Sequence, residues 1–264
     1  MLKRLKIAAF ILAFREVPIR VLKCLSTQTV KPSKVIIVAA YESACVQRFS
    51  DLDIECIVIP PNLNLTVGER VGISLSVAFR KIRIEGYDYL LKLDDDVVFD
   101  ERFIEDNVGS GYDLMGRGAA MIIRVEVYLK FFNHQWPINP IDDTYVVDTL
   151  LAAGYKVLPW SWIRRAIPIK EVHVSVEREF LAGVNLYKLG YPFTVALLAS
   201  FSTLIIRRRS ITGYIARVGG YIAALITRPS RYTAYERISK YKRYELMIKL
   251  KNLIQRLTKR YLMM

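Results

Sequence analysis

The first part of the chain alternates between strand-like and helix-like patterns of hydrophobic positions. Leu5 to Phe14 is a nearly continuous apolar run, which is typical of a buried strand. Val17 to Thr27 repeats apolar positions with a helical period and places Leu22 and Leu25 on one face. Lys34 to Ala40 is a second apolar run of strand length. This order predicts a strand, a helix and a parallel strand.

The same alternation continues along the chain. Glu55 to Ile59 predicts a short strand, Glu69 to Ile84 a helix and Tyr87 to Leu93 another strand. Further on, Thr144 to Ala153 predicts a helix and Tyr155 to Leu158 a strand. Strands that alternate with helices form a mostly parallel sheet with helices on both faces. The predicted fold class is therefore α/β.

Three consecutive carboxylates, Asp94, Asp95 and Asp96, follow directly on one predicted strand. Because side chains alternate along a strand, we expect Asp94 and Asp96 to point the same way and Asp95 elsewhere. Two convergent carboxylates suit a hard divalent cation. The alternative is a solvated acidic turn that caps the next segment. Ligands of parallel sheets bind beyond the carboxyl ends of the strands, which favours the cation site.

A second acidic pair, Asp142 and Asp143, opens the helix predicted for Thr144 to Ala153. One interpretation is a helix N-cap, a position where aspartate is common. The other is a general base that removes a proton from an acceptor hydroxyl near a bound cation. The pair by itself favours the cap.

The composition predicts an ordered protein in a reducing compartment. Of 264 residues, 53% are apolar, which is enough for a large core. The three cysteines, Cys24, Cys45 and Cys56, are odd in number and form no CxxC pair. We therefore expect neither a disulfide framework nor a structural zinc site. The segment up to Arg20 contains too few apolar residues to span a membrane, and it lacks a signal cleavage site.

The net charge of +14 is concentrated near the C-terminus. Residues 207–264 hold 15 Lys and Arg against two Asp and Glu, whereas the rest of the chain is nearly balanced. No zinc finger, RNP-like aromatic motif or helix-turn-helix signature accompanies the basic residues, so no nucleic-acid partner is expected. Basic residues beside apolar segments indicate an anionic membrane surface instead.

Two apolar segments precede the basic stretch. Tyr191 to Ile206 and Ile211 to Thr227 are both short for a membrane span. A spanning hairpin would leave Arg207 to Arg209 on the side opposite the preceding domain. Shallow or re-entrant insertion on the cytoplasmic face avoids this conflict, so we expect a membrane-associated protein on that face.

The last segment, Tyr235 to Tyr261, has the pattern of an amphipathic helix. Its apolar face consists of Leu246, Leu250, Leu253, Ile254, Leu257 and Tyr261. This pattern predicts binding to an anionic membrane surface through residues 190–264, and a helix packed on the domain is the alternative. The predicted organisation is an α/β domain at 1–180 and an α-helical membrane-associating region at 181–264.

Four stretches occur in a recognisable order between Lys6 and Val176. They are Ile11-Leu-Ala-Phe14-Arg15 with Leu25-Ser-Thr-Gln28-Thr-Val-Lys-Pro32 and Val35-Ile-Ile-Val38; Gly68-Glu-Arg70-Val-Gly72; Gly86-Tyr-Asp-Tyr-Leu-Leu-Lys-Leu-Asp94-Asp95-Asp96; and Met115-Gly-Arg-Gly118-Ala-Ala-Met-Ile-Ile-Arg124 with Asp142-Asp143 through Gly154-Tyr-Lys-Val. In this order they resemble the family 2 glycosyltransferases. The resemblance implies a GT-A fold, which is a Rossmann-like, mostly parallel sheet with helices on both faces.

The resemblance implies an inverting hexosyltransferase that uses a UDP- or GDP-sugar. Asp94 and Asp96 match the Asp-x-Asp carboxylates that hold Mg²⁺ or Mn²⁺ against the donor diphosphate. Asp96 is then the direct ligand, and Asp94 or Asp95 contacts the ribose or a metal-bound water. The cation neutralises the departing diphosphate. Asp143 matches the base that deprotonates the acceptor for attack from the face opposite the leaving group.

The resemblance also assigns the nucleotide-sugar site. Arg70 matches a position that contacts the diphosphate or the base, and Ala13, Phe14 and Arg15 match the loop around the nucleobase. This chain departs from the family after the second strand, where Ala-Ala-Tyr-Glu-Ser replaces the usual Asp-Asp-x-Ser turn. Glu42 in this stretch is expected to substitute for the missing acid.

Histidine and tryptophan residues late in the chain have two interpretations each. His173 matches a histidine that completes metal coordination in some members, and packing in a sheet is the alternative. His134 falls in the expected acceptor loop, where a structural or substrate-adjacent role is predicted. Trp160 and Trp162 fit a membrane interface better than stacking on a sugar because basic residues follow them.

The expected acceptor is a hydroxyl or phosphate on a glycan or a lipid-linked group. Two alternative functions remain. A non-catalytic membrane scaffold would keep the fold without turnover, which the missing acidic turn allows. A nucleotidyltransferase would carry a Gly-rich phosphate loop after its first strand, and Ala13 to Pro18 contains none.

Overall fold

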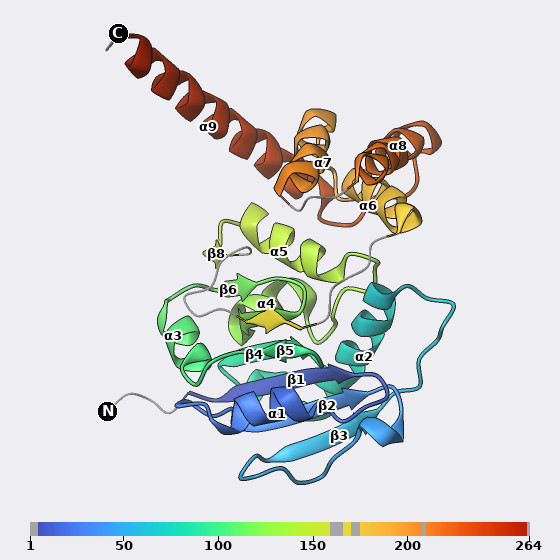
Figure 1. Ribbon diagram of the computed structural model, residues 1–264, viewed down its shortest axis with the longest axis vertical. Coiled ribbons are helices and arrows are strands. Elements are labelled where there is room, and N and C mark those ends of the chain that lie inside the picture. Colours follow the sequence, from blue (N-terminus) through green and yellow to red (C-terminus); the bar gives the residue numbers. More distant parts are fainter. Residues whose placement is uncertain (1–4, 159–165, 170–174, 207–209, 263–264) are drawn as a thin grey trace. The chain divides into compact units, whose positions relative to one another are not determined.

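A computed structural model describes residues 5–158, 166–169, 175–206 and 210–262. The chain forms two compact units (Figure 1). The first runs to Leu150 and includes Tyr155–Glu171, and the second consists of Leu151–Gly154 and Val172–Met264. The first unit contains the sheets, whereas the described part of the second is helical.

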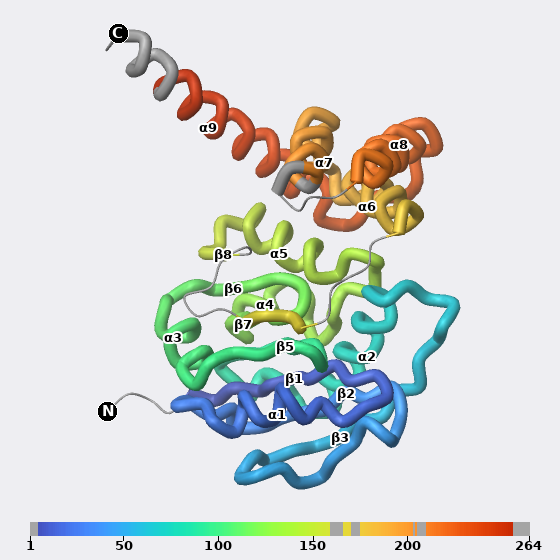
Figure 2. The backbone as a smooth tube through the Cα atoms, in the orientation of Figure 1, coloured from blue at the N-terminus to red at the C-terminus, as the bar shows by residue number. Residues whose placement is uncertain are grey.

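The first unit is built on a seven-stranded sheet with the order β3-β2-β1-β4-β7-β6-β8. Its strands are β1 (Ile7–Ala13), β2 (Lys34–Ala39), β3 (Ile54–Val58), β4 (Tyr89–Asp94), β6 (Leu114–Gly116), β7 (Ala120–Arg124) and β8 (Val157–Leu158). Neighbouring strands are parallel except that β7 runs antiparallel to β4 and β6. A second, antiparallel sheet pairs β5 (Val97–Val98) with β9 (Ile167–Pro168) (Figure 2). The prediction of a mostly parallel α/β sheet is confirmed.

Helices cover both faces of the large sheet. They are α1 (Ile19–Ser26), α2 (Val67–Ile82), α3 (Phe103–Gly109), α4 (Val125–Phe132) and α5 (Asp142–Ala152), with the 3-10 turns η1 (Glu42–Ala44) and η2 (Ile84–Gly86). On one face, Ile11 of β1 belongs to a core with Leu22 of α1 and Phe103 of α3. On the other, the ring of Phe10 meets that of Phe79 in α2, with 4.7 Å between centroids. Alternation along β1 therefore builds two cores, one on each face.

Helix α2 begins at Val67 rather than at the predicted Glu69. The Glu69 carboxylate accepts a hydrogen bond of 2.9 Å from the Thr66 backbone nitrogen, and the Thr66 hydroxyl accepts one from the Glu69 nitrogen. This reciprocal pair is a capping box, which satisfies two backbone donors at the helix start. The helix ends before Arg83, whose φ of 53° is left-handed.

The expectation for the cysteines is wrong. Cys45 and Cys56 form a disulfide, with 5.7 Å between their Cα atoms, and Cys24 is free. Cys45 follows η1 and Cys56 lies in β3, so the fold brings together two residues whose spacing matches no framework pattern. A bridge across a sheet loop depends on tertiary placement rather than on spacing. The cysteines therefore no longer support a reducing compartment.

The second unit contains four helices in its described part, namely α6 (Val176–Lys188), α7 (Phe193–Ile206), α8 (Ile211–Thr227) and α9 (Tyr235–Leu262). Helices α6 and α8 touch at glycines, because a Cβ at Gly183 would overlap the Arg217 carbonyl and one at Gly220 the Phe180 carbonyl. The same pair is joined by a buried ion pair, with the Arg217 Nε 2.7 Å from the Glu179 carboxylate. Close backbones and one internal ion pair thus hold α6 and α8 together.

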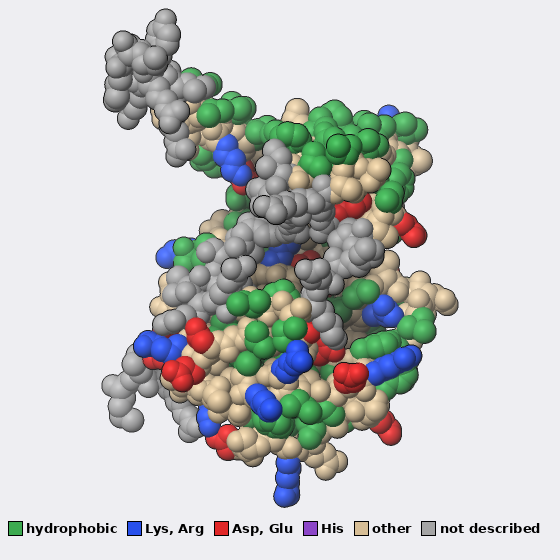
Figure 3. Space-filling view, viewed as in Figure 1, with side chains coloured by type: hydrophobic (Ala, Val, Ile, Leu, Met, Phe, Trp, Pro, Cys, Tyr) green, Lys and Arg blue, Asp and Glu red, His purple; other side chains and the backbone are tan. Residues whose placement is uncertain are grey.

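Apolar side chains remain exposed on the helices of the second unit. On α8 they include Ile215, Ile222, Leu225 and Ile226, and on α9 they include Met247, Leu250, Leu253 and Ile254. Figure 3 shows hydrophobic side chains gathered over α8. Among the described residues, no helix has both the length and the apolar character needed to cross a membrane.

Candidate active site

A pocket of about 320 Å³ opens where the parallel strands β1, β2 and β4 end. Its walls include Ala13 and Phe14 at the end of β1, Arg70 of α2 and the residues Asp94 to Asp96. Its size suits a small-molecule ligand. The pocket therefore lies where the positional rule for parallel sheets places a binding site.

All three carboxylate residues of the Asp cluster line this pocket. Strand β4 ends at Asp94, and Asp95 and Asp96 form a turn before β5. Strand alternation, on which the expected direction of Asp95 depends, therefore stops where the turn begins. The backbone nitrogen of Asp94 donates to the Ala119 carbonyl oxygen at 2.8 Å, which fixes the start of the turn against the segment before β7.

A lysine that sequence reasoning missed contacts the cluster. The Lys92 ammonium lies 3.2 Å from the Asp94 Oδ1 atom and donates a hydrogen bond of 2.8 Å to the Gly118 carbonyl. Burial lowers the pKa of Lys92, but the charges of Asp94, Asp142 and Asp143 outweigh burial and raise it above the usual value. The group is thus a buried cation among carboxylates. The signal in the sequence is a lone charge inside the apolar run that ends at Leu93.

The turn is also held from the side of β9. The backbone nitrogen of Ile169 donates to the Asp96 carbonyl at 2.8 Å, next to the β5–β9 pairing. His173 follows this segment but lies outside the described residues, as do Trp160 and Trp162. Their predicted roles stay predictions. The described residue His134 lies 3.5 Å from the Glu85 carboxylate, a contact on the surface.

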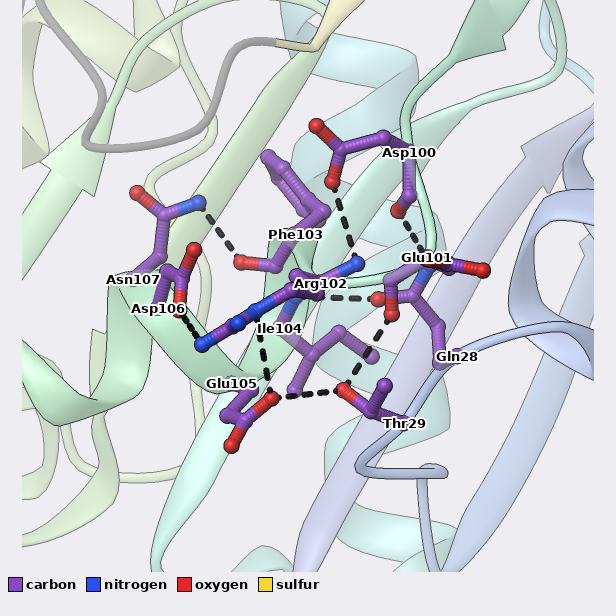
Figure 4. A network of polar contacts seen from close by, with 10 residues as sticks. All are labelled: Gln28, Thr29, Asp100, Glu101, Arg102, Phe103, Ile104, Glu105, Asp106 and Asn107. Carbon is purple, nitrogen blue, oxygen red and sulfur yellow. Dashed lines mark hydrogen bonds and ion pairs between the residues drawn. The ribbon is translucent and has the colours of Figure 1, made fainter.

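Gln28 fixes the segment that follows the Asp cluster (Figure 4). Its buried side chain donates to the Cys24 and Asp100 carbonyl oxygens at 3.0 and 2.6 Å, and accepts from the Ile104 nitrogen at 3.0 Å. The next residue, Thr29, donates from its backbone nitrogen to the Glu101 carbonyl at 2.8 Å. The Gln-Thr part of the sequence motif therefore ties the end of α1 to the start of α3.

Two aromatic rings pack against each other in the region where the nucleobase is expected. Phe14 and Tyr41 meet edge to face at 5.3 Å, and the Arg15 guanidinium lies 5.3 Å from the Phe14 ring centroid. The Ser43 hydroxyl donates to the Arg15 carbonyl at 2.7 Å and so ties this loop to η1. Ala13 and Phe14 line the pocket, whereas Arg15 and Glu42 are not among the described residues that do so.

Helix α2 lines the pocket and also packs against the loop before α5. A Cβ at Gly68 would lie 2.5 Å from the Asn139 carbonyl oxygen, and one at Gly72 would overlap the Pro137 carbonyl. The Ser76 hydroxyl accepts a hydrogen bond of 2.8 Å from the Trp136 backbone nitrogen. The two glycines of the Gly-x-Arg-x-Gly segment therefore let this loop lie directly on the helix that carries the pocket arginine.

The two acids at the start of α5 differ in their surroundings. Asp142 is buried, and its carboxylate accepts a hydrogen bond of 2.6 Å from the Trp136 indole. Burial raises the pKa of Asp142 to about 7, although Lys92 opposes the rise. Asp143 is less buried and accepts a hydrogen bond of 2.7 Å from the Thr144 nitrogen. Its Oδ2 atom lies 3.5 Å from the Arg117 guanidinium.

A backbone turn at Gly118 connects the surroundings of the Asp cluster with those of Asp143. Gly118 accepts the hydrogen bond from Lys92, and a Cβ at Gly118 would lie 3.8 Å from the Asp143 carboxylate. Gly118 has a φ of 75°, so the turn uses a left-handed conformation that glycine adopts without strain. Asp94 and Asp143, two residues far apart in the sequence, are thus linked through Lys92 and Gly118.

No protein-family model and no curated protein matches this sequence. Among solved structures, the chain is similar to the mannosyltransferase PcManGT from Pyrobaculum calidifontis in complex with GDP-Man and Mn²⁺. The TM-score is 0.55 and the identity 12%, over 96% of this chain and 88% of that one. The chain has a GT-A-like fold. TarS of S. aureus matches with a TM-score of 0.43 and 13% identity, over 76% of this chain and 40% of that one.

In this GT-A-like fold the donor atoms of the Asp cluster are carboxylate oxygens at the edge of a pocket. No group of three or more His, Cys, Asp or Glu side chains converges to hold a metal ion within the part of the chain that the structure describes. Mg²⁺ is commonly bound by one or two carboxylates together with substrate phosphates. The donor set therefore fits a hard cation that arrives with a diphosphate.

Proposed function

We propose that this chain transfers a sugar from a UDP- or GDP-sugar to an acceptor hydroxyl or phosphate with inversion. The observation that carries the proposal is the pocket at the strand ends, which the Asp cluster and Arg70 both line. Asp143 is not among the described residues that line this pocket, but its carboxylate lies beside Gly118, whose carbonyl oxygen accepts a hydrogen bond from Lys92. Fold similarity to a mannosyltransferase bound to GDP-Man and Mn²⁺ supports it. The roles of the site residues are part of this proposal.

The donor side of the site binds the nucleoside diphosphate. Ala13 and Phe14 line the pocket near the expected nucleobase, and the Arg70 guanidinium offers a positive charge to the diphosphate. Asp96, with Asp94 or Asp95, would hold Mg²⁺ or Mn²⁺, which when bound neutralises charge on the leaving diphosphate. His173 is proposed as a further ligand.

The acceptor side needs one base. We assign this role to Asp143, because its carboxylate is partly exposed beside the turn at Gly118, whereas Asp142 is buried against Trp136. Asp143 takes the proton of the acceptor hydroxyl as its oxygen attacks the sugar carbon from the face opposite the diphosphate. The new glycosidic bond forms as the bond to the diphosphate breaks, so the configuration inverts.

Binding and turnover of the full chain test the proposal. Isothermal titration with UDP, GDP and their sugars, with and without Mn²⁺, is expected to show metal-dependent binding of one nucleotide. The sugar nucleotide that binds should then release nucleoside diphosphate, with water or added lipid extract as acceptor. Metal-dependent binding without turnover would favour the non-catalytic scaffold, and release of pyrophosphate from a nucleoside triphosphate would favour the nucleotidyltransferase.

We further propose that the second unit binds an anionic membrane surface, which would bring a lipid-linked acceptor within reach. Exposed Leu250, Leu253 and Ile254 share α9 with many basic residues, and α8 exposes further apolar side chains. The three residues changed together to Gln should reduce flotation with phosphatidylcholine vesicles that contain phosphatidylglycerol. The matched control changes Leu63 to Gln, an exposed leucine of the first unit. Equal flotation of parent and triple variant would contradict the proposal.

A further inference from the structure

Lys92 is a buried lysine inside an apolar strand. It lies in β4 between Leu91 and Leu93, and only 6% of it is exposed. An ammonium group is unfavourable in such a place unless charged or hydrogen-bonding partners compensate for lost water. An apolar side chain at a buried position avoids this cost. The residues that contact the Lys92 ammonium group therefore indicate why a charged side chain occupies this position.

The partners of Lys92 lie on both sides of the site. Its Nζ atom is 3.2 Å from the Asp94 carboxylate, at the edge of the donor pocket, and 2.8 Å from the Gly118 carbonyl, in the turn beside Asp143. Both partners are oxygen atoms, which suit an ammonium group. Lys92 therefore links the edge of the pocket to the turn beside Asp143.

We propose that Lys92 is a positioning residue for sugar transfer, because its ammonium group holds the Asp94 carboxylate and the Gly118 turn in place. The inference rests on the proposed function and adds a residue that the family resemblance does not assign. While Asp94 is engaged by Lys92, it is a weaker ligand for a divalent cation. The cation then depends on Asp96 and on the donor diphosphate, so it binds weakly until the nucleotide is present.

Replacement of Lys92 by methionine in the full chain tests this inference. Methionine removes the charge and keeps an unbranched apolar side chain. The variant should bind Mn²⁺ alone at least ~5-fold more tightly, measured from the electron paramagnetic resonance signal of free Mn²⁺, because a repelling charge is gone. Its kcat for the sugar nucleotide should fall at least ~10-fold with a donor KM near that of the parent, because the Gly118 turn is no longer fixed.

These opposite changes separate a positioning role from a purely structural one. A structural lysine would weaken Mn²⁺ binding and turnover together, or leave both unchanged, and either result overturns the inference. Lys34→Met is the matched control, because Lys34 pairs with Asp53 at 2.9 Å at the amino end of β2. It should leave Mn²⁺ affinity and kcat unchanged.

A second variant keeps the inference testable if Lys92→Met does not fold. Lys92→Arg retains the charge but moves its donors, so Mn²⁺ affinity should stay close to that of the parent while kcat falls at least ~10-fold. An unchanged kcat overturns the inference. A parent chain that binds neither Mn²⁺ nor nucleotide contradicts the proposed function itself, whereas a binding parent with unaltered Lys92 variants contradicts only the role of Lys92.

Discussion

The Trp136 indole donates a hydrogen bond of 2.6 Å to the Asp142 carboxylate, and this contact places two adjacent acids in different surroundings. Asp142 is 8% exposed, whereas the side chain of Asp143 is 21% exposed beside Arg117. The backbone of Trp136 is itself bonded to Ser76 in α2. The start of α5 is therefore fixed from helix α2, which also lines the pocket at the strand ends.

The two acids should respond differently to the same substitution. Asp143→Asn removes the proposed base and should lower kcat by about 10²- to 10⁴-fold. Asp142→Asn keeps an oxygen that accepts from Trp136, so kcat should change by less than ~10-fold. Release of nucleoside diphosphate from the sugar nucleotide measures both. A larger loss in Asp142→Asn than in Asp143→Asn would contradict the assignment of the base.

The stability of the fold should depend on pH through Asp142. Burial raises its pKa to about 7 from a usual 3.8. Because the folded state binds this proton more tightly, the group stabilises the fold fully below about pH 4, and the contribution is lost as the pH rises to about 7. Asp142→Asn cannot titrate. Its free energy of unfolding relative to the parent should therefore rise by about 2 to 3 kcal/mol between pH 5 and pH 8.

Denaturant unfolding of parent and variant at both pH values measures this difference. The comparison cancels the titration of all other groups that the substitution leaves alone. Asp143→Asn is the matched control, since it changes the neighbouring acid at the start of the same helix. A relative stability of Asp142→Asn that stays constant with pH would show that the carboxyl group is not held protonated.

The sheet and its acidic edge were predictable because local pattern determines them. The apolar runs of β1, β2 and β4 are long, and the position rule for parallel sheets then places Asp94 at a ligand site. Lys92 and Arg117 were not assigned, because their partners come from distant segments. The direction of Asp95 could not be predicted by strand alternation because a turn replaces the strand after Asp94. Patterns of alternation carry no information about where a strand stops.

The packing roles of the motif glycines could not be predicted from the sequence either. Gly72 matched a motif position, but only the fold shows the Pro137 carbonyl against it. In the second unit, the apolar segment Ile211 to Thr227 forms helix α8, which Ser210 caps at its start and a left-handed Arg228 ends. Helix caps can be recognised in a sequence, whereas backbone contacts between segments far apart in the sequence cannot.

Gly72→Ala should disturb the site through packing alone. The added methyl group would overlap the Pro137 carbonyl, so the loop that carries Trp136 must shift. We expect a loss of about 1 to 3 kcal/mol in the free energy of unfolding and a lower kcat. Gly109→Ala in α3 is the matched control, because no atom lies within 4 Å of a Cβ there. Equal stability of the two variants would contradict the close approach.

The disulfide between Cys45 and Cys56 should stabilise the first unit and preserve nucleotide binding. It closes a loop of 11 residues in sequence separation, and its loss should lower the free energy of unfolding by about 2 to 3 kcal/mol. The bridge ties the turn after Tyr41 to β3, and Tyr41 packs on Phe14 at the pocket. Reduction should therefore also raise the Kd of the nucleotide, because the ring pair is held less firmly.

Thiol titration of the denatured, unreduced chain measures the bridge directly, and one reactive thiol is expected, that of Cys24. Changing both Cys45 and Cys56 to Ser should abolish the effect of dithiothreitol on thermal unfolding. Cys24→Ser should leave that effect intact, because this thiol lies outside the bridge. Three reactive thiols in the unreduced chain would contradict the disulfide, and the original expectation of unpaired cysteines would then stand.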